Sequence, residues 1–146
     1  MSEVRSCNIP DDLYYLVEKH VWVSYDGELV TVGMTDVAQH LAKTFLSVTA
    51  KKPGKLVKKG RSVATVESSK WVGPVPSPVQ GEVVEVNDAV VAKPSLINED
   101  PYGEGWVARL RPEDWAGDSA DLVTGAEGLA AYEAFLEAEG IDCSED

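Results

Sequence analysis

One stretch of the chain decides its fold: residues 62–87 read SVATVESSKWVGPVPSPVQGEVVEVN. Alternating apolar and polar residues predict a strand over 62–67 and another over 82–86. Between them the chain carries prolines at alternate positions, which confines that part to a loop or to the edge of a sheet. Lys70 therefore lies beside a turn at an outer end of the domain, where an enzyme can reach it.

A hairpin and a short helix are predicted upstream of this stretch. Residues 21–25 and 28–32 read as strands around Asp26-Gly27, a pair typical of a two-residue hairpin turn, and Gly33 ends the second strand. Thr35 or Asp36 can then cap a short helix, because both residue types satisfy the free N–H groups of a first helical turn.

The remaining segments continue the pattern of short strands. Residues 45–50 and 106–110 predict two more strands, and 98–105 predict a long turn. A weak internal repeat relates 55–60 to 82–87, since both read as a strand followed by a turn. Leu129, Tyr132, Phe135 and Leu136 have helical spacing. We therefore expect a mainly β fold, a small β-sandwich or flattened barrel, with one helix after the first hairpin and another at the C-terminal end.

Composition limits the function classes. The 146 residues carry 13 Lys and Arg against 25 Asp and Glu, and the sequence pI is near 4.5, which argues against a nucleic-acid binder. No apolar run approaches the ~20 residues that span a bilayer, and the first residues lack the apolar core of a signal peptide. We expect a cytoplasmic monomer that binds neither nucleic acid nor membrane.

The charge predicts three segments. Residues 112–146 hold 11 of the acidic residues and no Lys or Arg, so we assign 1–12 to an N-terminal extension, 13–111 to a β domain and 112–146 to an acidic helical segment and tail. Six basic residues crowd into 51–61 without an acidic one. They serve either as a solubilising edge or as a docking site for an acidic partner.

The chain lacks the patterns of a metal site or a catalytic triad. Its two histidines have no partner at metal-ligand spacing, and Gly103-Glu104-Gly105 is too short for a dinucleotide fingerprint. Cys7 and Cys143 lie near opposite ends. Their simplest interpretation is two reduced, partly exposed thiols; the alternative is a pair that comes together and is redox-active.

Several motifs resemble the glycine cleavage system H protein family. Val66-Glu67-Ser68-Ser69-Lys70 and Pro78 to Asn87 are similar to the lipoyl-lysine region of that family. Asn98 to Trp106 is similar to its second signature. The hairpin, the first helix and the closing helix match as well, so the resemblance covers about residues 13–139. It implies the lipoyl/biotinyl β-sandwich, with lipoate joined by an amide to Lys70.

The resemblance implies a carrier that is not itself an enzyme. A lipoyl group on Lys70 would act as a swinging arm, and Glu67, Ser69 and Trp71 would form the hairpin surface that a lipoate ligase or lipoyl assembly enzyme recognises. Biotin fits less well, because biotinyl domains place Met beside the lysine, whereas Ser69 and Trp71 stand here. Trp22, Tyr102, Trp106 and Phe135 are interpreted as packing residues, and Gly81 as a backbone requirement.

The chain departs from the family after the lysine. Lys70-Trp71-Val72-Gly73-Pro74 replaces the usual small residues and Ser-Asp pair. This segment is similar to the H-protein-like lipoate-binding proteins of bacterial sulfur oxidation, which work with a heterodisulfide-reductase-like complex. We favour that pathway. The alternative is a glycine cleavage H protein that serves glycine decarboxylase, aminomethyltransferase and dihydrolipoyl dehydrogenase.

Two other classes stay open from the sequence. The first is a binding module that kept the fold without the lipoyl arm. The second is an enzyme with a cysteine nucleophile, which the acidic neighbours of Cys143 disfavour because they would raise the pKa of its thiol.

Overall fold

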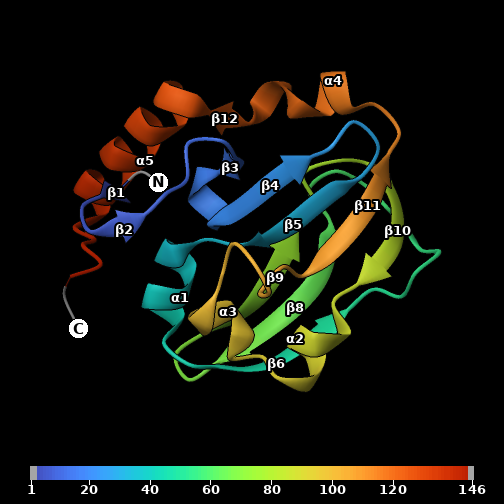
Figure 1. The fold of residues 1–146 in the computed structure, drawn as a ribbon, viewed down its shortest axis with the longest axis horizontal. Coiled ribbons are helices and arrows are strands. Elements are labelled where there is room, and N and C mark those ends of the chain that lie inside the picture. Colours follow the sequence, from blue (N-terminus) through green and yellow to red (C-terminus); the bar gives the residue numbers. More distant parts are fainter. Residues whose placement is uncertain (1–2, 145–146) are drawn as a thin grey trace.

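The computed structural model describes residues 3–144 and contains two β-sheets packed face to face (Figure 1). The larger sheet has seven strands, in the spatial order β12 (Val123–Thr124), β3 (Tyr14–Leu16), β4 (Val21–Tyr25), β5 (Val30–Met34), β11 (Ala108–Pro112), β10 (Gly81–Val86) and β7 (Leu56–Val57). The smaller sheet has the order β6 (Phe45–Ala50), β8 (Ser62–Ser68) and β9 (Val72–Pro76). Every pairing between strands is antiparallel.

Helices and a small hairpin surround the sandwich. The α-helices are α1 (Asp36–Ala42), α2 (Asp88–Ala92), α3 (Leu96–Glu99), α4 (Trp115–Asp118) and α5 (Gly125–Glu139), and the 3₁₀ turns are η1 (Val17–Lys19) and η2 (Ser119–Asp121). Strands β1 (Glu3–Val4) and β2 (Cys7–Asn8) form a separate hairpin. In Figure 1, α5 lies beside this hairpin, so the first and the last elements of the chain meet on one side of the molecule.

The main core lies between the two sheets. On β8, Ala64, Val66 and Ser68 are buried while Thr65 and Glu67 between them are exposed, as expected for a strand with one face in the core. Val75 on β9 joins them from the edge strand. Burying each such valine stabilises the fold by about 1.5–3 kcal/mol, so the hairpin that carries Lys70 rests on a rigid base.

A second core lies under α5. Tyr132 and Leu136 are fully buried and pack against Tyr15 and Trp22 of the larger sheet and against Ile9. The helical spacing found in the sequence therefore marks the face of α5 that covers the sheet. Through this second core, both ends of the chain take part in packing.

The structure confirms the mainly β fold with its two predicted helices. Thr35 caps α1 by accepting a hydrogen bond from the N–H of Ala38. The proline-rich segment forms β9 at an open edge of the smaller sheet, where a strand tolerates missing N–H donors. Gly81 approaches the backbone at Arg111 so closely that no side chain would fit, which confirms its backbone role.

Local boundaries differ from the prediction in four places. The Asp26-Gly27 hairpin has a four-residue loop, because the Asp26 carboxylate accepts hydrogen bonds from the N–H groups of Glu28 and Leu29 and Tyr25 pairs with Val30. The second strand of that hairpin continues past Gly33 to Met34. In the predicted turn 98–105, the first residues belong to α3. The strand predicted at 106–110 is β11, which begins and ends two residues later, at Ala108 and Pro112.

The expectation of two reduced, partly exposed thiols is wrong. Cys7 is fully buried and forms a disulfide with Cys143. The pairing follows from tertiary packing, because β2 and the segment after α5 meet at the second core. Residues 1–2 of the expected N-terminal extension and 145–146 of the expected acidic tail lie outside the described residues.

Candidate functional site

Lys70 lies in the tight turn that joins β8 to β9. Glu67 pairs with Val72 across the hairpin, so the turn consists of the four residues between them. The side chain of Lys70 is exposed. A turn at the end of two core-packed strands presents this lysine without burying its charge.

Ser68 organises the turn. Its hydroxyl donates to the carbonyl of Trp71 at 2.9 Å and accepts from the N–H groups of Lys70 and Trp71 at 3.3 and 2.9 Å. The N–H of Ser68 also donates to the Trp71 carbonyl at 2.7 Å. The side chain is almost completely buried, so these bonds are shielded from water. The backbone around Lys70 is therefore held in one conformation.

Ser69 joins the turn to the end of α1. Its N–H donates to the carbonyl of Thr44 at 2.9 Å. Just before this point, Lys43 adopts a positive φ of 68°, which is unusual for a residue with a side chain. Asn98 stabilises that conformation, because its amide donates to the Lys43 carbonyl and accepts from the N–H of Phe45. The bend after α1 thus helps to position the lysine turn.

An apolar hollow of about 610 Å³ opens beside Lys70. Its walls come from η1, the end of β5, α1, the lysine turn and the first residues of β9. The apolar side chains among them are Met34, Ala38, Leu41, Ala42, Trp71 and Val72, and η1 adds Glu18 and Lys19. A hollow of this size and lining can take a flexible apolar chain attached to the lysine.

His20 lies at one wall of this hollow and is neutral near pH 7. Its Nδ1 is 2.9 Å from the hydroxyl of Tyr132, and burial lowers the pKa of the imidazole to about 4. The Tyr132 hydroxyl also lies 3.1 Å from that of Thr35. The wall that His20 contributes therefore adds no positive charge to the hollow at neutral pH.

The four predicted site residues share the hairpin but face different surroundings. Lys70 and Trp71 line the hollow. Glu67 is exposed on β8 and Ser69 bonds to the end of α1, and neither residue lines the hollow. The side chain of Trp71 is 41% exposed and that of Val72 62%, so the hairpin presents apolar surface to the outside.

Sequence reasoning missed Ser68 and Asn98 as positioning residues. A serine just before a turn is a recognisable signal, because its hydroxyl can bond to backbone groups two and three residues ahead. Asn98 gave no such signal, since its partners lie 53 and 55 residues away along the chain.

The aromatic residues interpreted as packing residues have structural partners. Trp22 is 3% exposed and its indole N–H donates to the carbonyl of Pro101. Tyr102 donates to the carbonyl of Asn8. Trp106 lies under the guanidinium of Arg109, at 3.9 Å from the ring centroid, and Phe135 packs in the second core.

Neither a membrane helix nor a metal cluster occurs in the part of the chain that the structure describes. Within residues 3–144 no helix is long and apolar enough to cross a bilayer. The same residues contain no group of three or more His, Cys, Asp or Glu side chains that could hold a metal ion.

Comparisons with known proteins agree with this arrangement of hairpin, hollow and helices. A sequence model described as "Glycine cleavage H-protein" matches residues 13–137. The chain belongs to the glycine cleavage H-protein family. H proteins are lipoyl carriers without catalytic activity of their own, and the family carries lipoate on a lysine.

Individual relatives cover nearly the whole chain. "Glycine cleavage system H protein 2" of Aquifex aeolicus is 50% identical and covers 100% of this chain and 91% of its own. "Probable glycine cleavage system H protein 2" of Sulfolobus acidocaldarius is 40% identical over 94% of each. The crystal structure of an H protein from Mycobacterium marinum superposes with a TM-score of 0.75 at 31% identity, over 91% of this chain and 100% of that one.

Proposed function

We propose that Lys70 carries lipoate and that the lipoylated protein acts as a swinging-arm carrier between partner enzymes. The observation that carries the proposal is the position of Lys70. It is an exposed lysine on a turn that buried hydrogen bonds hold rigid, beside an apolar hollow. Membership of the H-protein family supports the same residue, because the lipoyl-lysine motif falls on 66–70.

The surroundings of Lys70 fit a lipoyl group. Amide formation removes the charge of the lysine, so the arm can lie on apolar surface instead of remaining in water. Met34, Ala38 and Leu41 supply that surface, and the nearby imidazole of His20 is uncharged at neutral pH. When bound, lipoate supplies a dithiolane that reacts by thiol–disulfide exchange. The residues of the chain hold and expose the arm.

The first candidate cargo is the aminomethyl group of glycine cleavage. The relatives described above are all named for that system. In this role the protein would meet glycine decarboxylase, aminomethyltransferase and dihydrolipoyl dehydrogenase in turn, as a cytoplasmic monomer. A lipoate ligase or lipoyl assembly enzyme would modify Lys70, with Glu67, Ser69 and Trp71 forming the surface that it recognises.

Sulfur carried to a heterodisulfide-reductase-like complex is the second candidate. The sequence favoured it modestly, whereas the names of the relatives favour glycine cleavage at least as strongly. One structural observation favours partners other than the usual ones of the family. Trp71 and Val72 place a bulky, exposed apolar patch beside the attachment site, where the family usually has small residues and where a partner must dock. In addition, three relatives numbered 2, 3 and 5 come from one organism, Aquifex aeolicus, which is more carriers than one glycine cleavage system needs.

Intact mass with peptide mapping tests the carrier proposal. The protein is produced together with lipoate and its native gene neighbours, and Lys70→Arg serves as the matched control because it keeps the charge. A lipoyl mass increment that maps to Lys70 and is missing from the control supports the proposal. An unmodified wild type, made while another lipoyl domain is modified in the same cells, would contradict it.

The cargo is then decided with the lipoylated protein and purified partners. Transfer of labelled carbon from glycine to the arm, in the presence of glycine decarboxylase, supports the first candidate. Mass increments of sulfur in the presence of the sulfur-oxidising complex, without transfer from glycine, support the second.

A further inference from the structure

A second hollow meets the first at Lys70. It has a volume of about 240 Å³, and its walls come from the end of α1 and from the segment after α5. The residues around it are His40, Leu41, Lys43, Lys70, Gly140, Ile141 and Asp142. Lys70 and Leu41 border both hollows. An arm on Lys70 therefore has two directions open to it, and the second leads to the C-terminal segment.

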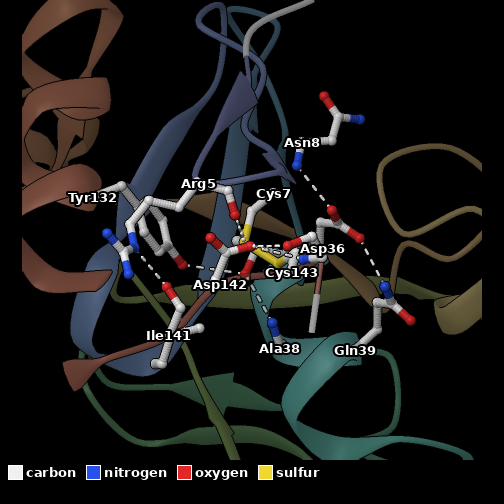
Figure 2. Close-up of a disulfide and its surroundings, with 12 residues drawn as sticks. Arg5, Cys7, Asn8, Asp36, Ala38, Gln39, Tyr132, Ile141, Asp142 and Cys143 are labelled. Carbon is white, nitrogen blue, oxygen red and sulfur yellow. Dashed lines mark hydrogen bonds between the residues drawn. A yellow bond between two sulfur atoms is a disulfide. The ribbon is translucent and has the colours of Figure 1, made fainter. Parts of the chain in front are cut away.

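The disulfide fixes this C-terminal wall. Cys143 directly follows Asp142 and is bonded to Cys7 of the N-terminal hairpin (Figure 2). Arg5 adds two hydrogen bonds to the same segment: its Nε donates to the Ile141 carbonyl at 2.7 Å, and its carbonyl accepts from the N–H of Cys143 at 3.0 Å. Figure 2 shows these residues gathered around the sulfur atoms.

The two cysteines differ in exposure. Cys7 is fully buried, whereas Cys143 is partly exposed. Thiol–disulfide exchange needs access along the S–S axis to one sulfur and expels the other as a thiolate. Cys143 is therefore the cysteine that a dithiol would attack, and the Sγ of Cys7 is the leaving group. The Arg5 carbonyl, 3.7 Å from the Sγ of Cys7, can accept the hydrogen of the thiol that forms.

We propose that the Cys7–Cys143 pair is a second redox site of this protein and exchanges electrons with the lipoyl arm on Lys70 of the same molecule. The inference rests on the proposed lipoylation of Lys70. It adds an electron acceptor within the chain, so that the redox state of the arm determines whether the disulfide, in addition to the hydrogen bonds, holds the C-terminal wall of the second hollow.

The exchange balances without another reagent. The S–S bond of Cys7 and Cys143 breaks, and each sulfur gains one electron and one proton. Both electrons and both protons come from the reduced arm, whose two sulfurs join in the dithiolane ring. The reverse reaction restores the disulfide and the dithiol. Release of Cys143 leaves Gly140–Asp142 held by the hydrogen bonds to Arg5 and to the end of α5.

Dihydrolipoyl dehydrogenase and NADH test the exchange by electron counting. The readout is NADH oxidised per protein, together with alkylation of the two cysteine peptides after an acid quench. Lipoylated wild type is compared with a lipoylated Cys7→Ser/Cys143→Ser double variant and with Lys70→Arg. The reduction potentials of the lipoyl arm and of the Cys7–Cys143 pair set the direction of electron exchange. The fully reduced proteins are therefore also titrated with NAD⁺, and the NADH formed is measured.

In at least one direction, wild type is expected to exchange two equivalents and the double variant one, with the redox change mapped to Cys7 and Cys143. A tethered arm has a millimolar effective concentration, so at ~10 µM protein the cysteines of wild type should react about a hundredfold faster than those of Lys70→Arg mixed with equimolar free lipoamide.

One equivalent in both directions, with the cysteine peptides unchanged, would overturn the inference while leaving the carrier intact. Equal rates for wild type and the mixture with free lipoamide would overturn it as well. Failure of the carrier proposal itself appears earlier and separately, as the lack of a lipoyl mass increment on wild type.

Discussion

The indole of Trp71 covers the backbone of Gly73: a Cβ built on Gly73 would lie 2.5 Å from Cζ2 of the ring. The glycine therefore allows the tryptophan to fold back along β9 and form a wall of the hollow beside Lys70. Trp71 and Gly73 are two residues apart and lie on the same face of the hairpin, so the missing side chain of the glycine makes room for the exposed indole.

Gly73→Ala should therefore displace the indole. We expect it to lower the free energy of unfolding by only about 0.5–1 kcal/mol, because the added methyl meets the outer end of a half-exposed side chain that can move toward solvent. The same change made in a Trp71→Ala background should cost under ~0.5 kcal/mol, since the clash is then gone. Urea unfolding of the four proteins measures the coupling; equal costs in both backgrounds would refute the contact.

Ser68→Ala should loosen the lysine turn. The change leaves the N–H groups of Lys70 and Trp71 without the Ser68 hydroxyl as acceptor, and we expect a loss of about 1–3 kcal/mol in unfolding free energy. Lipoylation of Lys70 should slow as well. For the unfolding free energy, Ser69→Ala is the matched control, because the hydroxyl of Ser69 makes only long contacts of 3.4–3.5 Å. A larger effect at Ser69 than at Ser68 would contradict this account.

Trp71→Ala should impair recognition without unfolding the domain. The side chain is 41% exposed and lies outside both cores, so we expect a small change in melting temperature. Ligase or partner binding should weaken, because an aromatic residue beside the attachment site is a typical interface anchor. Lipoylation rates and partner affinity are measured beside the melting curve. A melting temperature lowered by more than ~8 °C would instead identify Trp71 as a core residue.

Reduction of the disulfide should cost stability. Cys7 and Cys143 are 136 residues apart, and closing so long a loop stabilises a fold by roughly 5 kcal/mol in the chain-entropy account. Wild type should therefore unfold at lower urea concentration with a reductant present, while Cys7→Ser/Cys143→Ser should be insensitive to it. Hydrogen exchange should rise first at 3–9 and 140–144. Identical curves with and without reductant would contradict the prediction.

Stability should fall as the pH is lowered from about 6.5 to 4 because of His20. Burial lowers the pKa of its imidazole to about 4, whereas the unfolded chain takes up the proton near pH 6.5. Unfolding therefore binds a proton in this window, and the loss reaches roughly 3 kcal/mol at its lower end.

His20→Asn is the matched control for this pH dependence, because asparagine tolerates the positive φ of 57° at this position. The slope of unfolding free energy against pH should be smaller for the variant than for wild type. Equal slopes would show that the protonation of His20 is not coupled to folding.

The disulfide also bears on the expected cytoplasmic location. Stable disulfides are rare in a reducing cytosol, where those that occur are mostly transient or redox-active. A pair that exchanges electrons with a lipoyl arm would agree with such a compartment. The sequence left a redox-active cysteine pair open as an alternative. The tertiary structure makes that alternative testable, because it joins Cys7 to Cys143.

Local patterns in the sequence were enough to predict most of the elements. Alternation along 62–67 and 82–86 predicted β8 and β10, and helical spacing at Tyr132 and Leu136 predicted the buried face of α5. The motif that ends at Lys70 indicated the family. These signals are readable because neighbouring residues on one face of a strand or helix share one environment.

The boundaries that differed depend on bonds that the patterns do not contain. The Asp26 carboxylate lengthened a hairpin loop through two backbone N–H groups, and β11 begins later than the apolar residues around Trp106 suggested. Each is a choice between local alternatives of similar free energy, which a particular hydrogen bond or packing contact decides.

The sequence by itself determined the sandwich, the helices that cover it and the lysine at the tip of its hairpin, because these follow from residues close together in the chain. Only the tertiary structure joined Cys7 to Cys143, placed Asn98 behind the bend at Lys43 and brought Asp142 to the second hollow beside Lys70. Those contacts link residues 55 to 136 positions apart, and their partners are chosen by the packing of whole elements, which no local pattern encodes.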